Sequence, residues 1–291
     1  MLARFARGAK GCLVVVESSG GYERALTRVL AEHGVDYARV NPRQAREFAR
    51  ATGQLAKTAK ADAKVLAHMG RALELAPTPP PDPDRVRLAD LVARREDLVT
   101  DIGRESNRLG VTNDAWTSKE ITRLIKALNA HLADLDARIA ALVETCEALA
   151  RDNRRLRSVK GIGPVVAAVL MARLPELAAL DPHRPDPQRL DPHRLDHRQL
   201  ASLAGLAPHA GASGVHRGKR KVWGGRAEVR RALYIAAKSA SQWDPVVVAF
   251  KKRLTLAGKP FKVTILACAR KMLTILAAMF RNGEDYRKTA A

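Results

Sequence analysis

The most constraining feature of the sequence is a seam of apolar residues that crosses the middle of the chain. Its members recur at alternating spacings of four and three residues: Ile121, Ile125, Leu128, Leu132, Leu135, Ile139, Leu142, Cys146 and Leu149. This heptad spacing predicts a long helix packed in a coiled coil. Thr117 and Glu120 are predicted to form the capping box at its start.

Residues 85–109 carry a looser apolar pattern and few helix breakers. We therefore predict an antiparallel helical hairpin within a coiled-coil region at 85–157. Two interpretations of the seam remain open: an ordinary helix pair within one chain, or the interface of a homo-oligomer.

The first 76 residues have the pattern of a small α/β layer. Two apolar runs, at 12–16 and 35–40, predict strands, and each is followed by a helical segment. The strand–helix–strand–helix order predicts parallel strands. Glu17 stands at the end of the first strand. A proline-rich stretch at 77–84 then predicts a stiff linker.

The last domain, 158–291, is predicted to be helical, and it opens on Gly161-Ile-Gly163 after Lys160. This pattern is typical of a helix-hairpin-helix unit, in which glycine backbone N–H groups and a helix N-terminus approach a phosphate. We expect Lys160, Gly161 and Gly163 to contact a nucleic-acid backbone without regard to base sequence. The alternative is a turn that only separates two helices.

A low-complexity loop at 181–198 interrupts this domain, with Asp-Pro-His-Arg at 181 and again at 191. Its histidines, His183, His193 and His197, are candidate metal ligands. A solvated inserted loop is the simpler interpretation.

Positive charge is concentrated in the C-terminal third. The chain has 51 Lys and Arg against 30 Asp and Glu, a net charge of +21, and residues 201–291 carry +14 of it. Such an excess indicates a polyanionic partner, nucleic acid first and an anionic membrane surface second. The densest segment, 216–231, supplies the predicted backbone clamps Arg217, Lys219, Arg220, Lys221 and Arg226.

Several classes of protein are disfavoured by composition. Three cysteines are too few for a disulfide scaffold. The longest apolar runs are shorter than the roughly 20 residues of a membrane span. We therefore expect a cytoplasmic, DNA-associated protein rather than a secreted or membrane protein.

Two groups of residues suggest phosphoryl-transfer chemistry. Ser213, before Gly214, lies beside the clustered cations, which suits a hydroxyl that attacks a phosphodiester. No His or Lys stands beside it at a diagnostic spacing. Glu17 and Asp62 are carboxylates that could share Mg²⁺, a cation that prefers oxygen ligands.

Several blocks of sequence resemble, in the same order, the insertion-sequence 110/116/902 family of transposases. The blocks are Val-Val-Val-Glu-Ser-Ser-Gly-Gly-Tyr-Glu at 14–23, Asn41-Pro-Arg-Gln44, the run from Phe48 to Thr58, Gly161-Ile-Gly-Pro164, Leu203-Ala-Gly-Leu-Ala-Pro208, Ser213-Gly214, Trp223-Gly-Gly-Arg226 and Lys271-Met-Leu-Thr-Ile-Leu276.

The resemblance implies a three-part architecture. Residues 1–76 would form a partial RuvC-like (RNase-H-like) domain, 85–157 a coiled coil, and 158–291 an α-helical C-terminal transposase domain with the helix-hairpin-helix. It also implies a four-carboxylate DEDD metal site and a nucleophilic serine, which match Glu17, Asp62 and Ser213 here. The implied activity is Mg²⁺-assisted DNA recombination through a covalent phosphoserine, guided by a structured RNA from the element.

Two departures from the family pattern concern the metal site. Ala59 occupies the position of the third acid of the family pattern. The first acid would lie upstream of residue 1, which indicates an N-terminally shortened copy. We expect this copy to be feebly active or inactive because of weak metal binding. The alternative is a catalytically dead nucleic-acid-binding remnant, while a junction-cutting nuclease would need the missing carboxylates.

Overall fold

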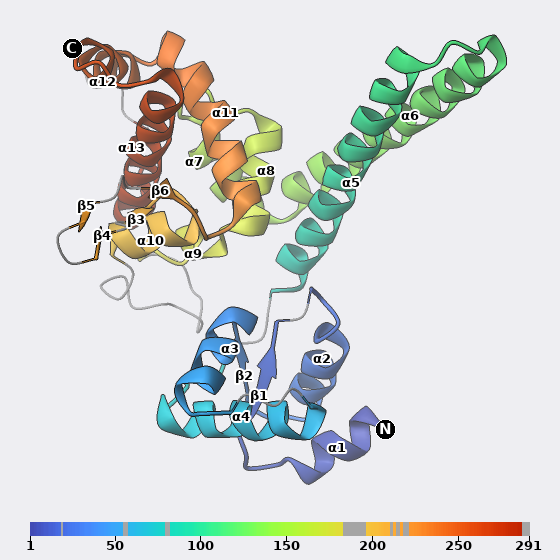
Figure 1. Cartoon of the computed structure of the whole chain (residues 1–291), viewed down its shortest axis with the longest axis vertical. Coiled ribbons are helices and arrows are strands. Elements are labelled where there is room, and N and C mark those ends of the chain that lie inside the picture. The colour runs from blue at the N-terminus through green and yellow to red at the C-terminus, as the bar shows by residue number, and fades with distance from the viewer. Residues whose placement is uncertain are drawn as a thin grey trace. The chain divides into compact units, whose positions relative to one another are not determined.

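A computed structural model of the chain describes residues 1–18, 20–54, 58–78, 82–182, 196–209, 212–213, 216–217 and 221–286 (Figure 1). Two compact units are present, residues 1–81 and residues 82–291.

The first unit is built on a two-stranded parallel sheet. Strand β1 (Val14–Glu17) pairs with β2 (Tyr37–Val40), and Glu17 lies opposite Val40 in the register. Helix α2 (Arg24–Glu32) makes the crossover between them. The parallel pairing predicted from the strand–helix–strand order is confirmed, although β1 and β2 each begin two residues later than predicted and β1 ends one residue later.

Helices cover both faces of this sheet (Figure 1). Helix α1 (Leu2–Gly8) and α2 share a buried cluster with Val16 and Tyr37. Helices α3 (Pro42–Ala51) and α4 (Ala59–Ala72) pack on the opposite face, around Val15 and Val40. The helical segment predicted after the second strand is therefore two helices. Gly70 allows α4 to approach β1, since a Cβ there would lie 2.6 Å from Cγ2 of Val15.

The proline-rich segment is bound to ordered structure at both of its ends. The Thr78 N–H donates to the Tyr37 carbonyl at 2.6 Å, and Thr78 Oγ1 accepts from the Arg39 N–H at 2.8 Å. At the other end, Asp82 is the N-cap of helix α5 (Pro83–Val111), where Pro83 occupies the favoured first turn. The last residues of the predicted linker thus belong to a helix.

Helices α5 and α6 (Ala115–Thr145) form a helical hairpin joined by residues 112–114 (Figure 1). Asp114, rather than Thr117, is the N-cap of α6. The Asp114 carboxylate accepts from the backbone N–H and the hydroxyl of Thr117, each at 2.7 Å. These hydrogen bonds lower the pKa of Asp114. The predicted capping box is therefore wrong, because Thr117 already lies in the helix.

The apolar seam packs against α5 within the chain. Leu135, Ile139 and Leu142 are buried, whereas the seam positions from Ile121 to Leu132 are half-buried. The helix stops at Thr145, and the seam continues into α7 (Glu147–Arg157), where Leu149 is buried. The described residues thus give the seam an intramolecular role and leave the homo-oligomer as a prediction.

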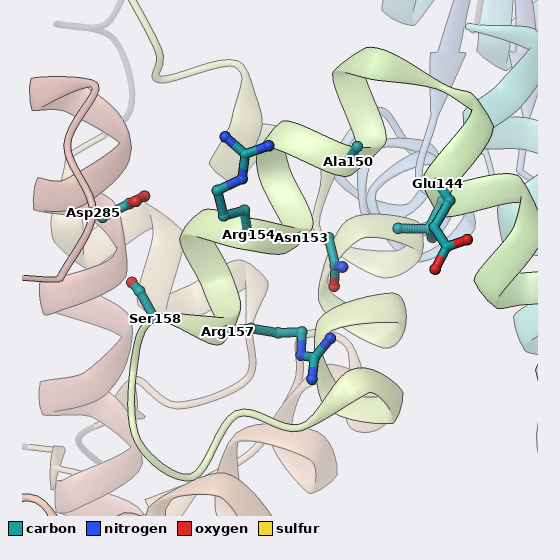
Figure 2. A pocket seen from close by; sticks show the side chains of 8 residues that line it. Glu144, Ala150, Asn153, Arg154, Arg157, Ser158 and Asp285 are labelled. Atoms are coloured by element: carbon teal, nitrogen blue, oxygen red, sulfur yellow. The ribbon is translucent and has the colours of Figure 1, made fainter.

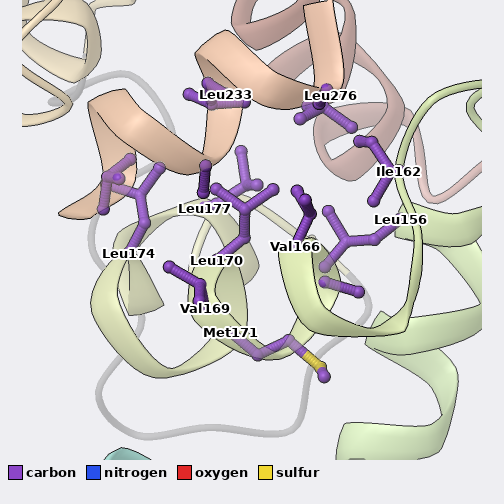
Figure 3. Close-up of a cluster of buried hydrophobic side chains, with 14 of the residues drawn as sticks. Leu156, Ile162, Val166, Val169, Leu170, Met171, Leu174, Leu177, Leu233 and Leu276 are labelled. Atoms are coloured by element: carbon purple, nitrogen blue, oxygen red, sulfur yellow. The ribbon is translucent and has the colours of Figure 1, made fainter. Parts of the chain in front are cut away.

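The second unit has one large core that extends from the base of the hairpin into the C-terminal helices. Figure 3 shows side chains of α7, α8, α9, α11 and α13 meeting there. The remaining elements are α8 (Pro164–Arg173), α9 (Pro175–Ala178), α10 (His197–Leu203), β3 (Pro208–His209), β4 (Ala212–Ser213), β5 (His216–Arg217), β6 (Lys221–Val222), α11 (Ala227–Trp243), α12 (Pro245–Leu256) and α13 (Phe261–Asn282).

Helix α13 is the one helix in the described part of the chain that is long and apolar enough to cross a membrane. More than half of its most apolar stretch is buried inside the unit, where it contacts α11 and α12. Ile265, Met272 and Leu276 have no exposed surface. We interpret α13 as the central core helix of this unit.

Candidate functional site

Glu17 and Asp62, the two carboxylates singled out from the sequence, line the same pocket. This pocket lies in the first unit and has a volume of about 570 Å³. Its other lining residues are Pro42, Arg43, Ala45, Arg46, Ala49, Arg50, Gln54, Val65 and Leu66, all from α3, α4 and the turn after α3. The structure thus brings together two acids that are 45 positions apart in the sequence.

The strand pattern explains why Glu17 faces this pocket. Side chains alternate along a strand, so Glu17 shares a face with Val15, the face that α3 and α4 cover. Glu17 is also the last residue of β1, and ligands of parallel sheets gather at the carboxyl ends of strands. The position of this carboxylate therefore follows from the fold.

Asp62 is held at the start of α4. Thr58 caps this helix, and its Oγ1 accepts from the Ala61 N–H at 3.2 Å. Asp62 lies in the first turn, where the helix dipole favours a negative charge. Ala59 stands three residues before Asp62, so the two positions are neighbours on one face of the helix.

The glycine turn between α7 and α8 is packed against α11. Gly161 has φ +93°, and a Cβ there would lie 2.5 Å from the Ala236 carbonyl oxygen and 2.8 Å from the Ala240 nitrogen. This close approach requires a glycine whether or not a phosphate binds. By contrast, a Cβ at Gly163, the N-cap of α8, would meet nothing within 4 Å. The Lys160 ammonium donates to the Trp243 carbonyl at 3.2 Å.

Two glycine motifs of the C-terminal unit contact each other. Gly205 and Gly225 both have positive φ, and a Cβ on Gly225 would lie 2.3 Å from the Gly205 nitrogen. Arg230 donates to the carbonyls of Gly205 and Gly224, at 3.2 and 2.8 Å. Only glycine permits so close an approach of two backbone segments.

Arg226 is engaged by protein groups. Its guanidinium donates to both carboxylate oxygens of Glu176, each at 2.6 Å, and to the Arg173 carbonyl at 2.9 Å. This two-point pair matches the geometry by which arginine would hold a phosphate. We therefore interpret Arg226 as a structural arginine within this unit, and its role as a backbone clamp stays a prediction.

The backbone at Ser213 belongs to a short antiparallel pair. Strands β4 and β5 set Ser213 opposite His216 and Ala212 opposite Arg217. Strands β3 and β6, which flank this pair in the sequence, set His209 opposite Lys221. The sequence spacing had not singled out His216 as a neighbour of Ser213. Lys219 and Arg220, together with His183 and His193, lie outside the described residues.

A cationic surface on α11–α13 had not been predicted residue by residue. Between residues 229 and 283 there are eleven Lys and Arg, and Asp244 is the only acid. Asp244 is buried, so residues 229–283 present no exposed carboxylate. Exposed Trp243 and Phe261 accompany the cations. Counting charges over residues 229–283 would have predicted this surface. The sequence analysis singled out the denser cationic run at 216–231 instead.

A second pocket, of about 470 Å³, lies beside α7 (Figure 2). Arg154 and Arg157 line it, but their guanidinium groups point in different directions, and Glu144 and Asp285 balance their charge. This mixed surface has no evident ligand chemistry. The pocket of Glu17 and Asp62 is the better candidate.

A family model described as a transposase, the DEDD domain of IS110, matches residues 1–112, and one described as the transposase IS116/IS110/IS902 family matches residues 190–252. Two relatives, each called "Pilin gene-inverting protein", come from Moraxella bovis and Moraxella lacunata. Each is 27% identical over 282 residues, which is 94% of this chain and 82% of the relative.

A third relative, the "Insertion element IS110 uncharacterized 43.6 kDa protein" of Streptomyces coelicolor, is 29% identical over 154 residues. That alignment covers 52% of this chain and 33% of the relative. The two family models fall on opposite ends of the chain, in the order expected. The chain belongs to the IS110/IS116/IS902 family of transposases.

Membership of this transposase family makes DNA the partner and a divalent cation the expected cofactor. The residues present fit Mg²⁺ in one way only. Among the described residues, no three or more acidic, histidine or cysteine side chains are grouped so that they could hold a metal ion by themselves. Mg²⁺ is commonly held by one or two carboxylates together with substrate phosphates. Glu17 and Asp62 would be the residues that hold Mg²⁺, with DNA supplying the remaining oxygens.

Proposed function

We propose that this transposase recombines DNA by attack of Ser213 on a phosphodiester, with Glu17 and Asp62 holding Mg²⁺ at the reacting phosphate. The observation that carries the proposal is that Glu17 and Asp62 line one pocket at the carboxyl end of β1. When bound, Mg²⁺ would neutralise charge that develops on the phosphate oxygens. RuvC-like and helix-hairpin-helix domains remain part of this proposal.

The reaction has two balanced steps. In the first, a bond forms between Ser213 Oγ and phosphorus, the phosphorus–oxygen bond of one DNA strand breaks, and the leaving strand hydroxyl takes the serine proton. In the second, the hydroxyl of another strand attacks the phosphoserine, returns a proton to Ser213 and restores the phosphodiester. Splitting the transfer in this way lets the strands exchange without hydrolysis.

The outcome we propose is a site-specific rearrangement of DNA, in line with the two relatives named for inverting a pilin gene. An RNA from the element is proposed as the guide, and a homo-oligomer as the active assembly, because strand exchange needs two DNA sites held together. The same family membership supports a cytoplasmic, DNA-associated protein.

A second candidate, a nucleic-acid-binding remnant without activity, is favoured by Ala59. The family pattern has a carboxylate at this position, which lies three residues before Asp62 on α4. Both candidates require binding to DNA, so binding does not separate them.

Strand exchange separates the two candidates. Purified chain would be incubated with Mg²⁺, the flanking-element RNA and paired DNA sites, and recombinant junctions would be counted. We expect few junctions from the chain and none from Ser213→Ala, Glu17→Gln or Asp62→Asn. The exposed Ser106→Ala is the matched control and should resemble the unmodified chain. Junctions that persist in Ser213→Ala would overturn the serine mechanism, and their complete absence from the chain would favour the remnant.

A further inference from the structure

Helix α3 adds cations to the pocket of the two acids. Arg43, Arg46 and Arg50 all line it. Their spacings of three and four residues place them along one face of α3. Glu17 and Asp62 therefore do not make this pocket acidic, because three guanidinium groups outnumber two carboxylates.

The three arginines differ in what already engages them. Arg43 Nε donates to Glu47 Oε1 at 2.8 Å, an ion pair along the same helix. Arg46 and Arg50 form no ion pair with any carboxylate in the part of the chain that the structure describes, and both are exposed. Their guanidinium groups are thus available to a ligand from solution.

The lining also limits the kind of ligand. Ala45 and Val65 are buried, whereas Arg46, Arg50 and Asp62 are exposed. The buried part of the lining, which we call the floor, is therefore apolar. Arginine has a planar, permanently charged fork that matches the oxygens of a phosphate. A phosphodiester in this pocket would contact the arginines with its charged oxygens and cover the apolar floor with its sugar.

We propose that Arg46 and Arg50 are positioning residues that bind a DNA phosphodiester in this pocket, beside Glu17 and Asp62, without requiring a divalent cation. The choice of DNA rests on the proposed function, whereas the phosphate chemistry rests on the arginines. The arginines would hold the phosphate without Mg²⁺. The phosphate oxygens would then supply the Mg²⁺ ligands that Glu17 and Asp62 alone do not provide. Binding of DNA and of Mg²⁺ is therefore mutually reinforcing, as linkage requires.

The test is hydrogen exchange of the full chain with a short DNA duplex in EDTA. We expect DNA to slow exchange in α3 and at the start of α4, and separately in α11–α13. In Arg46→Gln/Arg50→Gln, protection of α3 should need about tenfold or more DNA, since charged hydrogen bonds are lost. Protection of α11–α13 should stay unchanged.

A matched control removes the same charge elsewhere in the first unit. Arg28→Gln/Arg71→Gln alters residues of α2 and α4 that do not line the pocket, and it should retain full protection of α3. In Arg46→Lys/Arg50→Lys, partial recovery is expected, because lysine restores the charge without the fork. Adding Mg²⁺ should tighten α3 protection in the unmodified chain and not in Glu17→Gln/Asp62→Asn.

Each outcome has a definite meaning. Protection of α3 that survives in the glutamine variant, or falls equally in the Arg28/Arg71 control, would overturn the proposal. Protection of α11–α13 with none in α3 would overturn it while leaving the proposed DNA function intact. No protection anywhere would contradict both.

Discussion

The two glycines of the turn between α7 and α8 differ in whether packing requires a glycine at that position. Gly161 has positive φ and lies against the backbone of α11, whereas Gly163 faces open space. We expect Gly161→Ala to lower the free energy of unfolding by about 2 kcal/mol or more, through strain and a backbone clash. Gly163→Ala should cost less than about 1 kcal/mol. Urea unfolding measures both, and equal losses would contradict the packing described for the turn.

The hydrogen-bonded pair of half-buried Tyr286 and buried Asp244 gives a second residue-scale expectation. Burial, together with the charge and hydrogen bond of Asp244, raises the pKa of Tyr286 to about 12. A raised pKa means that the stabilisation is complete below pH 10 and is lost as the pH rises through about 12. Tyr286→Phe should cost about 1 kcal/mol at pH 8 and should abolish this alkaline loss. An identical alkaline profile in the variant would assign the loss to another group.

Which residues could be predicted depends on how local their signals are. Glu17 and Asp62 stand out because one ends an apolar strand and the other opens a capped helix. The partner of Arg226 is Glu176, fifty positions upstream, and no local sequence pattern at either residue predicts this ion pair. Arg46 and Arg50 lie in a helix rich in charge, so only the fold shows that its arginines line the same pocket as the two acids.

At the scale of elements, the heptad seam predicted the helix and its apolar face well. It did not reveal the interruption at Cys146, where the backbone is extended (φ −95°, ψ 110°) without a glycine or proline to mark it. It also could not distinguish a partner helix of the same chain from one of another chain. The strands were easier, because β-branched runs ended by turn residues are strong local signals.

Self-association of the hairpin is best tested away from its core. Leu135 is only 8% exposed and packs against α5, so Leu135→Lys would unfold the hairpin base as well as alter an interface. Leu124 is 46% exposed, and Leu124→Lys should leave hairpin stability within about 0.5 kcal/mol. We expect light scattering at tens of micromolar to show an oligomer that this variant shifts to smaller species. A monomeric unmodified chain would refute the oligomer.

At the scale of the whole molecule, charge governs association with DNA. With about six phosphates neutralised, affinity should fall on the order of a thousandfold between 50 and 200 mM salt, because condensed counterions are released. Filter binding with unrelated duplexes measures this slope and its weak dependence on sequence. A flat salt response would contradict the prediction that the basic C-terminal third binds a polyanionic backbone.

The overall organisation was more predictable than the site. Strand order indicated an α/β layer, heptads a helical middle, and charge a basic C-terminal part. Each of these features follows from local composition or periodicity. The pocket depends on contacts across the first unit, between the end of β1, the face of α3 and the first turn of α4. Sequence spacing alone does not set those distances.

The most direct test of the account is to restore a third carboxylate and count recombinant DNA. Ala59→Asp places an acid one turn before Asp62, beside the Mg²⁺ that Glu17 and Asp62 are proposed to hold. In the strand-exchange assay, we expect this variant to form more Mg²⁺-dependent junctions than the unmodified chain, and Ala59→Asp/Ser213→Ala to form none. Junctions that still form in Ala59→Asp/Ser213→Ala would contradict the proposed serine attack. Robust exchange by the unmodified chain that Glu17→Gln does not reduce would contradict the proposed metal site.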